Sequence, residues 1–204
     1  MARTPDPALT LARCTTGADA EAAIAIIAAA FARDPAMLHF VGSAPDPDAL
    51  RGRIVTAVVR AHLAAGEPAF LLRREGEAVA AALVEVARSP WRGVWGLLRT
   101  WRLWLRLPLL SIRRMNAYLR HSRAGVDGAS NYLVMIGVRP DLRGQGLGGA
   151  FLGLLERDVR PGHGWSLDTE NGANVALYEK LGFARVGTVA WDGLSIHQMH
   201  KPGG

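Results

Sequence analysis

The sequence predicts an α+β fold with a mixed sheet, and two observations support that prediction. Two apolar segments, residues 69–74 and 78–86, flank a tight turn at Glu75–Gly76 and are expected to form a β-hairpin. Further along, an apolar run at residues 132–138 leads through a glycine-dense turn into a segment whose apolar residues repeat with the period of a helix. Strands first, followed by a strand–helix–strand order, are typical of α+β domains.

The chain before the hairpin is expected to contain one strand and two helices. Thr16 or Asp19 is expected to cap the first helix, because short polar side chains accept hydrogen bonds from the first helical turn. The Asp34–Pro35 pair ends that helix, since the residue before a proline disfavours helical backbone. The expected elements are a strand at residues 8–14, a helix at 20–32, and a helix within 44–66 that ends at Gly66.

After the glycine-dense turn, the pattern predicts a helix and then three more strands with one helix among them. Asn171 is expected to cap the later helix and Gly182 to stop it. Asp192–Gly193 is expected to form the turn between the last two strands. The expected elements are a strand at residues 164–169, a helix at 172–181, and strands near 183–190 and 194–200.

Composition favours one folded domain over residues 1–204. Domains typically run to ~100–200 residues, and 50% of these residues are hydrophobic, so global disorder is not expected. The net charge of +6 comes almost wholly from arginine, since Lys180 and Lys201 are the only lysines. An arginine-, alanine- and glycine-rich composition is weak evidence for nucleic-acid binding, but a basic chain would attract a ligand that carries phosphates.

The only cysteine, Cys14, cannot form an internal disulfide, which favours a reducing, cytoplasmic location. The N-terminal segment lacks the apolar stretch of a signal peptide. No group of histidines, cysteines or carboxylates has the spacing of metal ligands, so no metal is expected.

The glycine-dense turn after residues 132–138 is a candidate anion site. Glycines let the backbone approach a ligand, and the first N–H groups of a helix point outward at the positive end of its dipole. The P-loop lysine is absent and so is the dinucleotide G-x-G-x-x-G order. The pattern that remains is R-x-x-G-x-G, formed by Arg143, Gly146 and Gly148 after a strand that ends V-x-P.

At these residues the chain resembles the GNAT superfamily, N-acetyltransferases that hold the pyrophosphate of acetyl-CoA on this loop. A second block, Leu167–Phe183, resembles the family's later strand and helix, with Asn174 and Tyr178 at matching positions. The resemblance implies a mixed, mostly antiparallel central sheet flanked by helices. Two further stretches, residues 28–40 and 199–204, resemble the puromycin N-acetyltransferase-like group, which modifies small amines.

The resemblance also implies roles for individual residues. The pantetheine arm of acetyl-CoA would lie along the strand 132–138 as an added strand, Asn174 would bond it, and Tyr178 would protonate the leaving sulfur. A phenol with a pKa near ~10 is protonated at neutral pH and donates well. For Arg143 either a phosphate contact or bracing of the loop is expected. The predicted acetyl-CoA-binding residues are Ile136, Val138, Arg143, Gly144, Gln145, Gly146, Leu147, Gly148, Gly149 and Asn174.

The general base has no clear motif. The acceptor amine must lose a proton before it attacks the thioester, and no carboxylate lies on the strand 132–138. Asp168 is the first choice; Glu170 should point the same way, because strand residues alternate with period two. A carboxylate bracing the next loop is the alternative role for Asp168. Weaker candidates for the base are His39, Glu85 and His197.

Residues 90–123 form a Trp/Arg-rich helical insertion that departs from the family pattern. Arg92, Arg99, Arg102 and Arg106 fall within one arc of a helical wheel, and a broad apolar arc contains Leu97, Leu98, Trp101, Trp104 and Leu105. Pro108 should divide the helix. The first interpretation is a helix packed on the sheet; the others, in decreasing order, are a wall for an apolar substrate, a homodimer contact and a membrane-surface helix.

The sequence therefore predicts an acetyl-CoA-dependent N-acetyltransferase that acts on a small-molecule amine by direct transfer in a ternary complex. The isolated Cys14 does not support a covalent acyl-enzyme. Nucleic acid is not an expected partner. The alternatives are acetylation of a protein or peptide amine, and an acyl-CoA-binding module without turnover.

Overall fold

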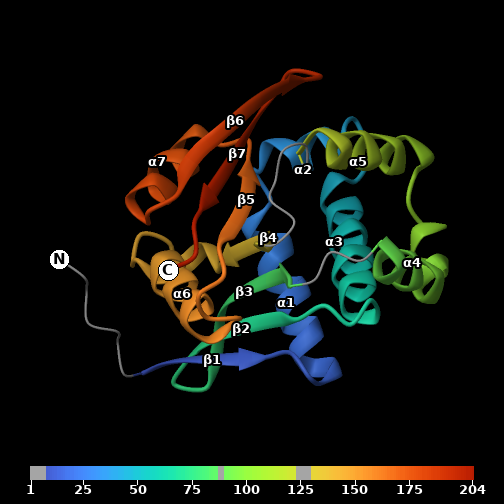
Figure 1. Ribbon diagram of the computed structural model, residues 1–204. Coiled ribbons are helices and arrows are strands. Elements are labelled where there is room, and N and C mark those ends of the chain that lie inside the picture. The colour runs from blue at the N-terminus through green and yellow to red at the C-terminus, as the bar shows by residue number, and fades with distance from the viewer. Residues whose placement is uncertain (1–7, 87–89, 123–129) are drawn as a thin grey trace.

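The computed structural model describes residues 8–86, 90–122 and 130–204, and for residues 90–92 it describes the backbone only. In these residues seven strands form one sheet in the order β1-β2-β3-β4-β5-β7-β6 (Figure 1). All neighbouring strands are antiparallel except β4 and β5. The strands are β1 (Leu9–Arg13), β2 (Ala69–Arg74), β3 (Glu77–Glu85), β4 (Asn131–Val138), β5 (Trp165–Thr169), β6 (Ala184–Trp191) and β7 (Leu194–Lys201).

Helices cover both faces of this sheet, as the α+β prediction requires. The helices are α1 (Gly17–Ala30), α2 (Pro35–Val41), α3 (Pro47–Ala64), α4 (Pro90–Trp104), α5 (Leu109–Ser122), α6 (Leu147–Asp158) and α7 (Gly172–Lys180), with a 3-10 turn, η1 (Pro140–Leu142). Strand β3 is buried on both sides, because Leu83 packs in the core under α1 and α3 while Val84 packs in the core under α6 and α7. The hairpin at Glu75–Gly76 and the Asp192–Gly193 turn are present as predicted.

The helix-capping predictions are confirmed. Thr16 caps α1: the Asp19 N–H donates to its side chain, and the Thr16 N–H donates back to the Asp19 carboxylate, both over 3.1 Å. Asn171 caps α7 by accepting from the Ala173 N–H at 3.0 Å. Helix α1 ends at Ala30 rather than at the expected Asp34–Pro35 pair. Asp34 instead begins α2, a helix that the sequence analysis did not predict, by accepting from the Met37 N–H at 2.9 Å.

The Trp/Arg-rich segment folds as two helices, α4 and α5, divided before Pro108 as predicted. Helix α4 packs on α3, on the side of α3 away from the sheet (Figure 1), so the expected packing of α4 directly on the sheet is wrong. The physical reason is that α3 already covers this face. The contact is close at Gly96, where an added Cβ would lie 2.5 Å from the Ala61 carbonyl oxygen.

In the described residues no single helix is long and apolar enough to cross a membrane. Only α1 and α2 taken together reach that length and hydropathy, and they are bent by 97° at their junction.

Candidate active site

The glycine-dense turn joins β4 to α6 and has the geometry of an anion site. Gly144 and Gly146 have φ values of +79° and +78°, a region that side chains with a Cβ rarely adopt. Gly146 is the N-cap of α6, and no side chain caps this helix. At Gly148 an added Cβ would meet only Val138, at 3.8 Å. The first-turn N–H groups of α6 can therefore approach a phosphate closely.

Two arginine hydrogen bonds tie this turn to neighbouring elements. The Arg143 guanidinium donates to the Ala30 carbonyl oxygen at the last residue of α1, over 2.6 Å. The Arg74 guanidinium donates to the Gln145 side-chain oxygen over 3.0 Å. The bond to Ala30 fits the bracing role expected for Arg143, and the phosphate role stays a prediction.

Strands β4 and β5 diverge beside this turn. They pair at only two positions, Asn131 with Trp165 and Tyr132 with Ser166, although β4 continues to Val138. A bulge in the pairing of β3 with β4, between Leu133 and Met135, lies directly after the last pair with β5.

The register shows which amides of β4 face the resulting gap. The Arg139 N–H donates to the Val79 carbonyl oxygen on β3 over 3.0 Å. Alternate residues of an antiparallel strand point their amides to opposite sides. The amides of Ile136 and Val138 therefore face β5, where that strand has already diverged.

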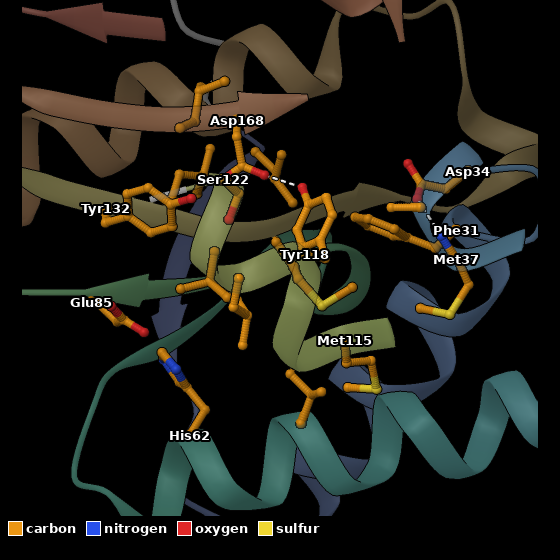
Figure 2. Close-up of a pocket in the computed structure, with 18 of the residues that line it drawn as sticks. Phe31, Asp34, Met37, His62, Glu85, Met115, Tyr118, Ser122, Tyr132 and Asp168 are labelled. Carbon is orange, nitrogen blue, oxygen red and sulfur yellow. Dashed lines mark hydrogen bonds between the residues drawn. The ribbon is translucent and has the colours of Figure 1, made fainter. Parts of the chain in front are cut away.

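A cavity of about 630 Å³ opens from this gap toward the helices α2, α3, α4 and α5. Figure 2 shows part of its lining, including Met115, Tyr118 and Asp168. Most of its lining is apolar, with Ile54, Val58 and Met115 on the helical side. The structure brings four predicted site residues into the lining, namely Ile136, Asp168, Asn174 and Tyr178.

One end of the cavity contains a cluster of carboxylates around a tyrosine. The Tyr118 hydroxyl, on α5, contacts the carboxylates of both Asp168 and Glu170 at the end of β5. Figure 2 shows the contact with Asp168. The expectation that Asp168 and Glu170 point the same way is confirmed. Asp34 also lines the cavity, and burial raises the pKa of its carboxyl group.

This cluster raises the pKa of Glu170 to about 8, chiefly because the carboxyl group is buried. The Tyr118 hydrogen bond opposes this rise, while the charges of Asp168 and Asp34 add to it. A hydroxyl has one proton and can donate to only one carboxylate at a time. A proton held on Glu170 therefore relieves the crowding of negative charge around Tyr118.

Tyr178 lies in the same cavity on α7. Its ring packs against Phe183, with ring centroids 5.7 Å apart. Burial, and then the negative charges of Asp168, Asp34 and Glu170, raise the pKa of Tyr178 above its usual value. The hydroxyl is therefore protonated at neutral pH and can act as a donor.

The remaining sequence candidates lie in different environments. Asn174 lines the cavity and donates to the Thr169 hydroxyl over 3.3 Å. Glu85 lines the cavity at the end near α3. Neither His39 nor His197 is a lining residue, so the structure does not bring them to the carboxylate cluster.

Cys14 is buried, and burial raises the pKa of its thiol to about 11, so it is not a thiolate at neutral pH. No group of three or more histidine, cysteine or acidic side chains in the described residues could hold a metal ion.

The sequence analysis missed Tyr118 and Asp34. Tyr118 lies in the Trp/Arg-rich segment, where no motif singles it out, and it meets β5 only through the fold. Asp34 was interpreted only as a helix stop. Its position just before Pro35 signalled a helix start as well, but no local signal places it beside the cavity.

Comparison with known proteins gives a match over the region that contains the glycine turn and the carboxylate cluster. A sequence model of the Acetyltransferase (GNAT) domain matches residues 115–185. Comparison with curated proteins by sequence gives no significant match.

Solved structures share the fold over nearly the whole chain. A Corynebacterium glutamicum protein described as histone acetyltransferase HPA2 and related acetyltransferase is 21% identical, with a TM-score of 0.67 and 97% of each chain covered. The Escherichia coli ribosomal-protein-S18-alanine N-acetyltransferase is 20% identical, with a TM-score of 0.54, 95% of this chain and 93% of that chain covered. YncA from Salmonella typhimurium, solved with acetyl-CoA, is 19% identical, with a TM-score of 0.53 and the same coverage.

Residues 115–185 match an acetyltransferase domain, and the fold of the chain is that of solved acetyltransferases. The strand, glycine turn and helix that carry the family's motif lie inside the matched residues. The chain is therefore similar to GNAT acetyltransferases in sequence over residues 115–185 and in fold over nearly its whole length.

Proposed function

We propose that this protein transfers the acetyl group of acetyl-CoA directly to a primary amine of a small molecule with an apolar body. One observation carries the proposal: a single cavity joins the gap between β4 and β5 to a carboxylate cluster and an apolar chamber. The gap suits a cosubstrate, the cluster suits an amine, and the chamber suits an apolar substituent. A concave, mostly apolar chamber of this kind favours a small acceptor over a folded protein surface.

Acetyl-CoA fits the turn and the gap. It supplies an activated acetyl group on a thiol that is released after transfer. The amides at the start of α6 would bind its pyrophosphate, since Gly146 leaves them uncapped. The Ile136 and Val138 amides would bond its pantetheine arm, and an amide of β4 would also stabilise the negative charge that develops on the acetyl oxygen.

The carboxylate cluster would bind and deprotonate the amine. A primary amine reaches the protein mainly as a cation, and Asp168 and Glu170 lie together at the end of the chamber. A general base works best when its pKa is near the working pH, and the pKa of Glu170 is about 8. We assign the base to the Asp168–Glu170 pair as a unit, because Tyr118 couples the two carboxylates.

Tyr178 would complete the transfer by donating its proton to the departing sulfur. Its raised pKa keeps the hydroxyl protonated until charge develops on the leaving group. The reaction then needs no covalent acyl-enzyme, which agrees with the protonated state of Cys14.

The decisive experiment incubates the protein with acetyl-CoA and a panel of amines and measures free thiol. We expect turnover with amines that carry an aromatic or branched apolar group, and little with small hydrophilic amines. Tyr178→Phe should lower kcat by ~10²–10⁴-fold while acetyl-CoA affinity stays nearly unchanged. Wild-type protein that binds acetyl-CoA but acetylates no amine in the panel would refute the enzymatic proposal.

A further inference from the structure

Helix α4 presents an apolar face to solvent rather than to the core. Its small and polar side, with Gly96 and Thr100, faces α3. Six large apolar residues of α4, α5 and the turn between them are more than half exposed, and we call them the α4–α5 face. They are Trp95 (61%), Leu98 (58%), Trp101 (52%), Leu105 (73%), Leu109 (68%) and Leu110 (58%).

Such a concentration of exposed leucine and tryptophan is unusual for a chain that works alone in water. Exposed apolar side chains elsewhere in the described residues occur singly, as Leu177 on α7 and Val186 on β6 do. The α4–α5 face therefore indicates a surface that another phase or molecule covers. The sequence analysis expected the apolar arc of α4 to pack on the sheet, and for Leu98, Trp101 and Leu105 that is wrong.

The charge around the face indicates what covers it. Residues 90–122 contain seven arginines and no aspartate or glutamate. The side chains of Arg99, Arg102, Arg106, Arg113 and Arg120 are exposed. A symmetric contact with a second copy would bring these arginines against one another, so charge argues against a homodimer here.

We propose that the α4–α5 face docks on an anionic phospholipid membrane surface. Leucine and tryptophan side chains enter the boundary between headgroups and acyl chains, and arginines contact the phosphates. The Arg102 guanidinium lies over the Trp101 ring at 5.5 Å from its centroid, which keeps the charge at the level of the headgroups while the ring lies below it. In such docking the protein lies on the membrane surface and does not span the bilayer.

The face adjoins the cavity of the proposed active site. Leu97 is 48% exposed next to Leu98 and also lines the cavity, as does Trp104. A docked protein would therefore hold the wall of its acceptor chamber against the lipid. That consequence rests on the proposed function, whereas the docking itself does not.

Sedimentation of the full chain with vesicles tests the docking without any acetyl transfer. We expect binding to phosphatidylcholine vesicles that contain phosphatidylglycerol, much weaker binding to phosphatidylcholine alone, and loss of binding at high salt. Leu98→Ser combined with Trp101→Ser should lower the partition coefficient at least ~10-fold. Arg102→Gln combined with Arg106→Gln should lower it roughly 30-fold at low salt, about 5-fold for each arginine.

Matched controls come from β6, where Arg185 and Val186 are exposed on a different part of the molecule. Arg185→Gln combined with Val186→Ser should bind vesicles as the wild type does, and thermal melting checks that all variants are folded. Equal binding by wild type and both α4 variants overturns the proposal. Absence of vesicle binding by the wild type also overturns it. A concentration-dependent dimer that only the Leu98/Trp101 variant loses would overturn it as well, because that result identifies a second copy as the occupant of the face.

Discussion

Replacing Tyr118 with phenylalanine tests the carboxylate cluster most directly. The change removes the hydroxyl that contacts both Asp168 and Glu170, while the ring keeps its edge-on packing against Phe40, where the centroids are 5.4 Å apart. The Tyr118 hydrogen bond lowers the pKa of Glu170 from what burial alone would produce. Its loss should therefore raise that pKa further.

The size of the shift follows from the strength of such a bond. A hydrogen bond to a charged group contributes ~1.5–3 kcal/mol, and one pH unit corresponds to ~1.4 kcal/mol. The pKa of Glu170, about 8 in the wild type, should rise by ~1–2 units. The base must be a carboxylate to accept the amine proton, so activity near neutral pH should fall by ~10–100-fold.

The assay is the pH dependence of kcat/KM, measured by thiol release with one fixed amine. The acceptor's own ionisation affects wild type and variant equally, so it cancels in the comparison. Tyr178→Phe is the control, since it should lower kcat without moving the acidic limb. An acidic limb that stays in place in Tyr118→Phe, or moves to lower pH, would refute the assignment of the base to this cluster.

Three further predictions concern stability and binding. The pKa of Glu170 rises on folding from 4.5 to about 8, so the wild type should lose stability as the pH rises between these two values. The stability advantage of Glu170→Gln over the wild type should grow across the same pH range. A difference in melting temperature that stays constant with pH would contradict this. Gly146→Ala, at φ +78°, should cost ~1–2 kcal/mol and reduce the thermal shift produced by acetyl-CoA, whereas Gly153→Ala, with open space inside the same helix, should keep the shift. Gly96→Ala should destabilise the packing of α4 on α3, because the new Cβ would lie 2.5 Å from a carbonyl oxygen. Gly93→Ala should not, because a Cβ there would have nothing within 4 Å. Equal denaturant midpoints for the two variants would count against the contact.

The parts of the fold with local signals were predictable from the sequence. The residues of the turns at Glu75–Gly76 and Asp192–Gly193 have positive φ values, which their glycines tolerate. Thr16 and Asn171 are residue types that favour helix N-caps, and each caps the helix predicted after it. The glycine turn was recognisable because its glycines follow a buried strand, and few other residues allow a ligand such close approach to the backbone.

The chemistry of the acceptor end was not predictable to the same degree. Tyr118 and Asp168 are 50 residues apart in the chain, and only the path of α5 over the end of β5 brings them together. The predicted packing of helix α4 was wrong for a related reason. An amphipathic pattern shows that an apolar face exists, but whether that face is turned to the core depends on which helix covers the sheet first, and here that helix is α3.

The divergence of β4 from β5 has a consequence for the empty protein. From the divergence onward, β4 is an edge strand in the middle of a sheet, and exposed strand edges are templates for pairing with another chain. A ligand arm that bonds the amides of Ile136 and Val138 would complete the sheet and so act as part of the fold. Those two amides should exchange hydrogen for deuterium more slowly once acetyl-CoA is added, and protein kept without it should be the form that aggregates during storage.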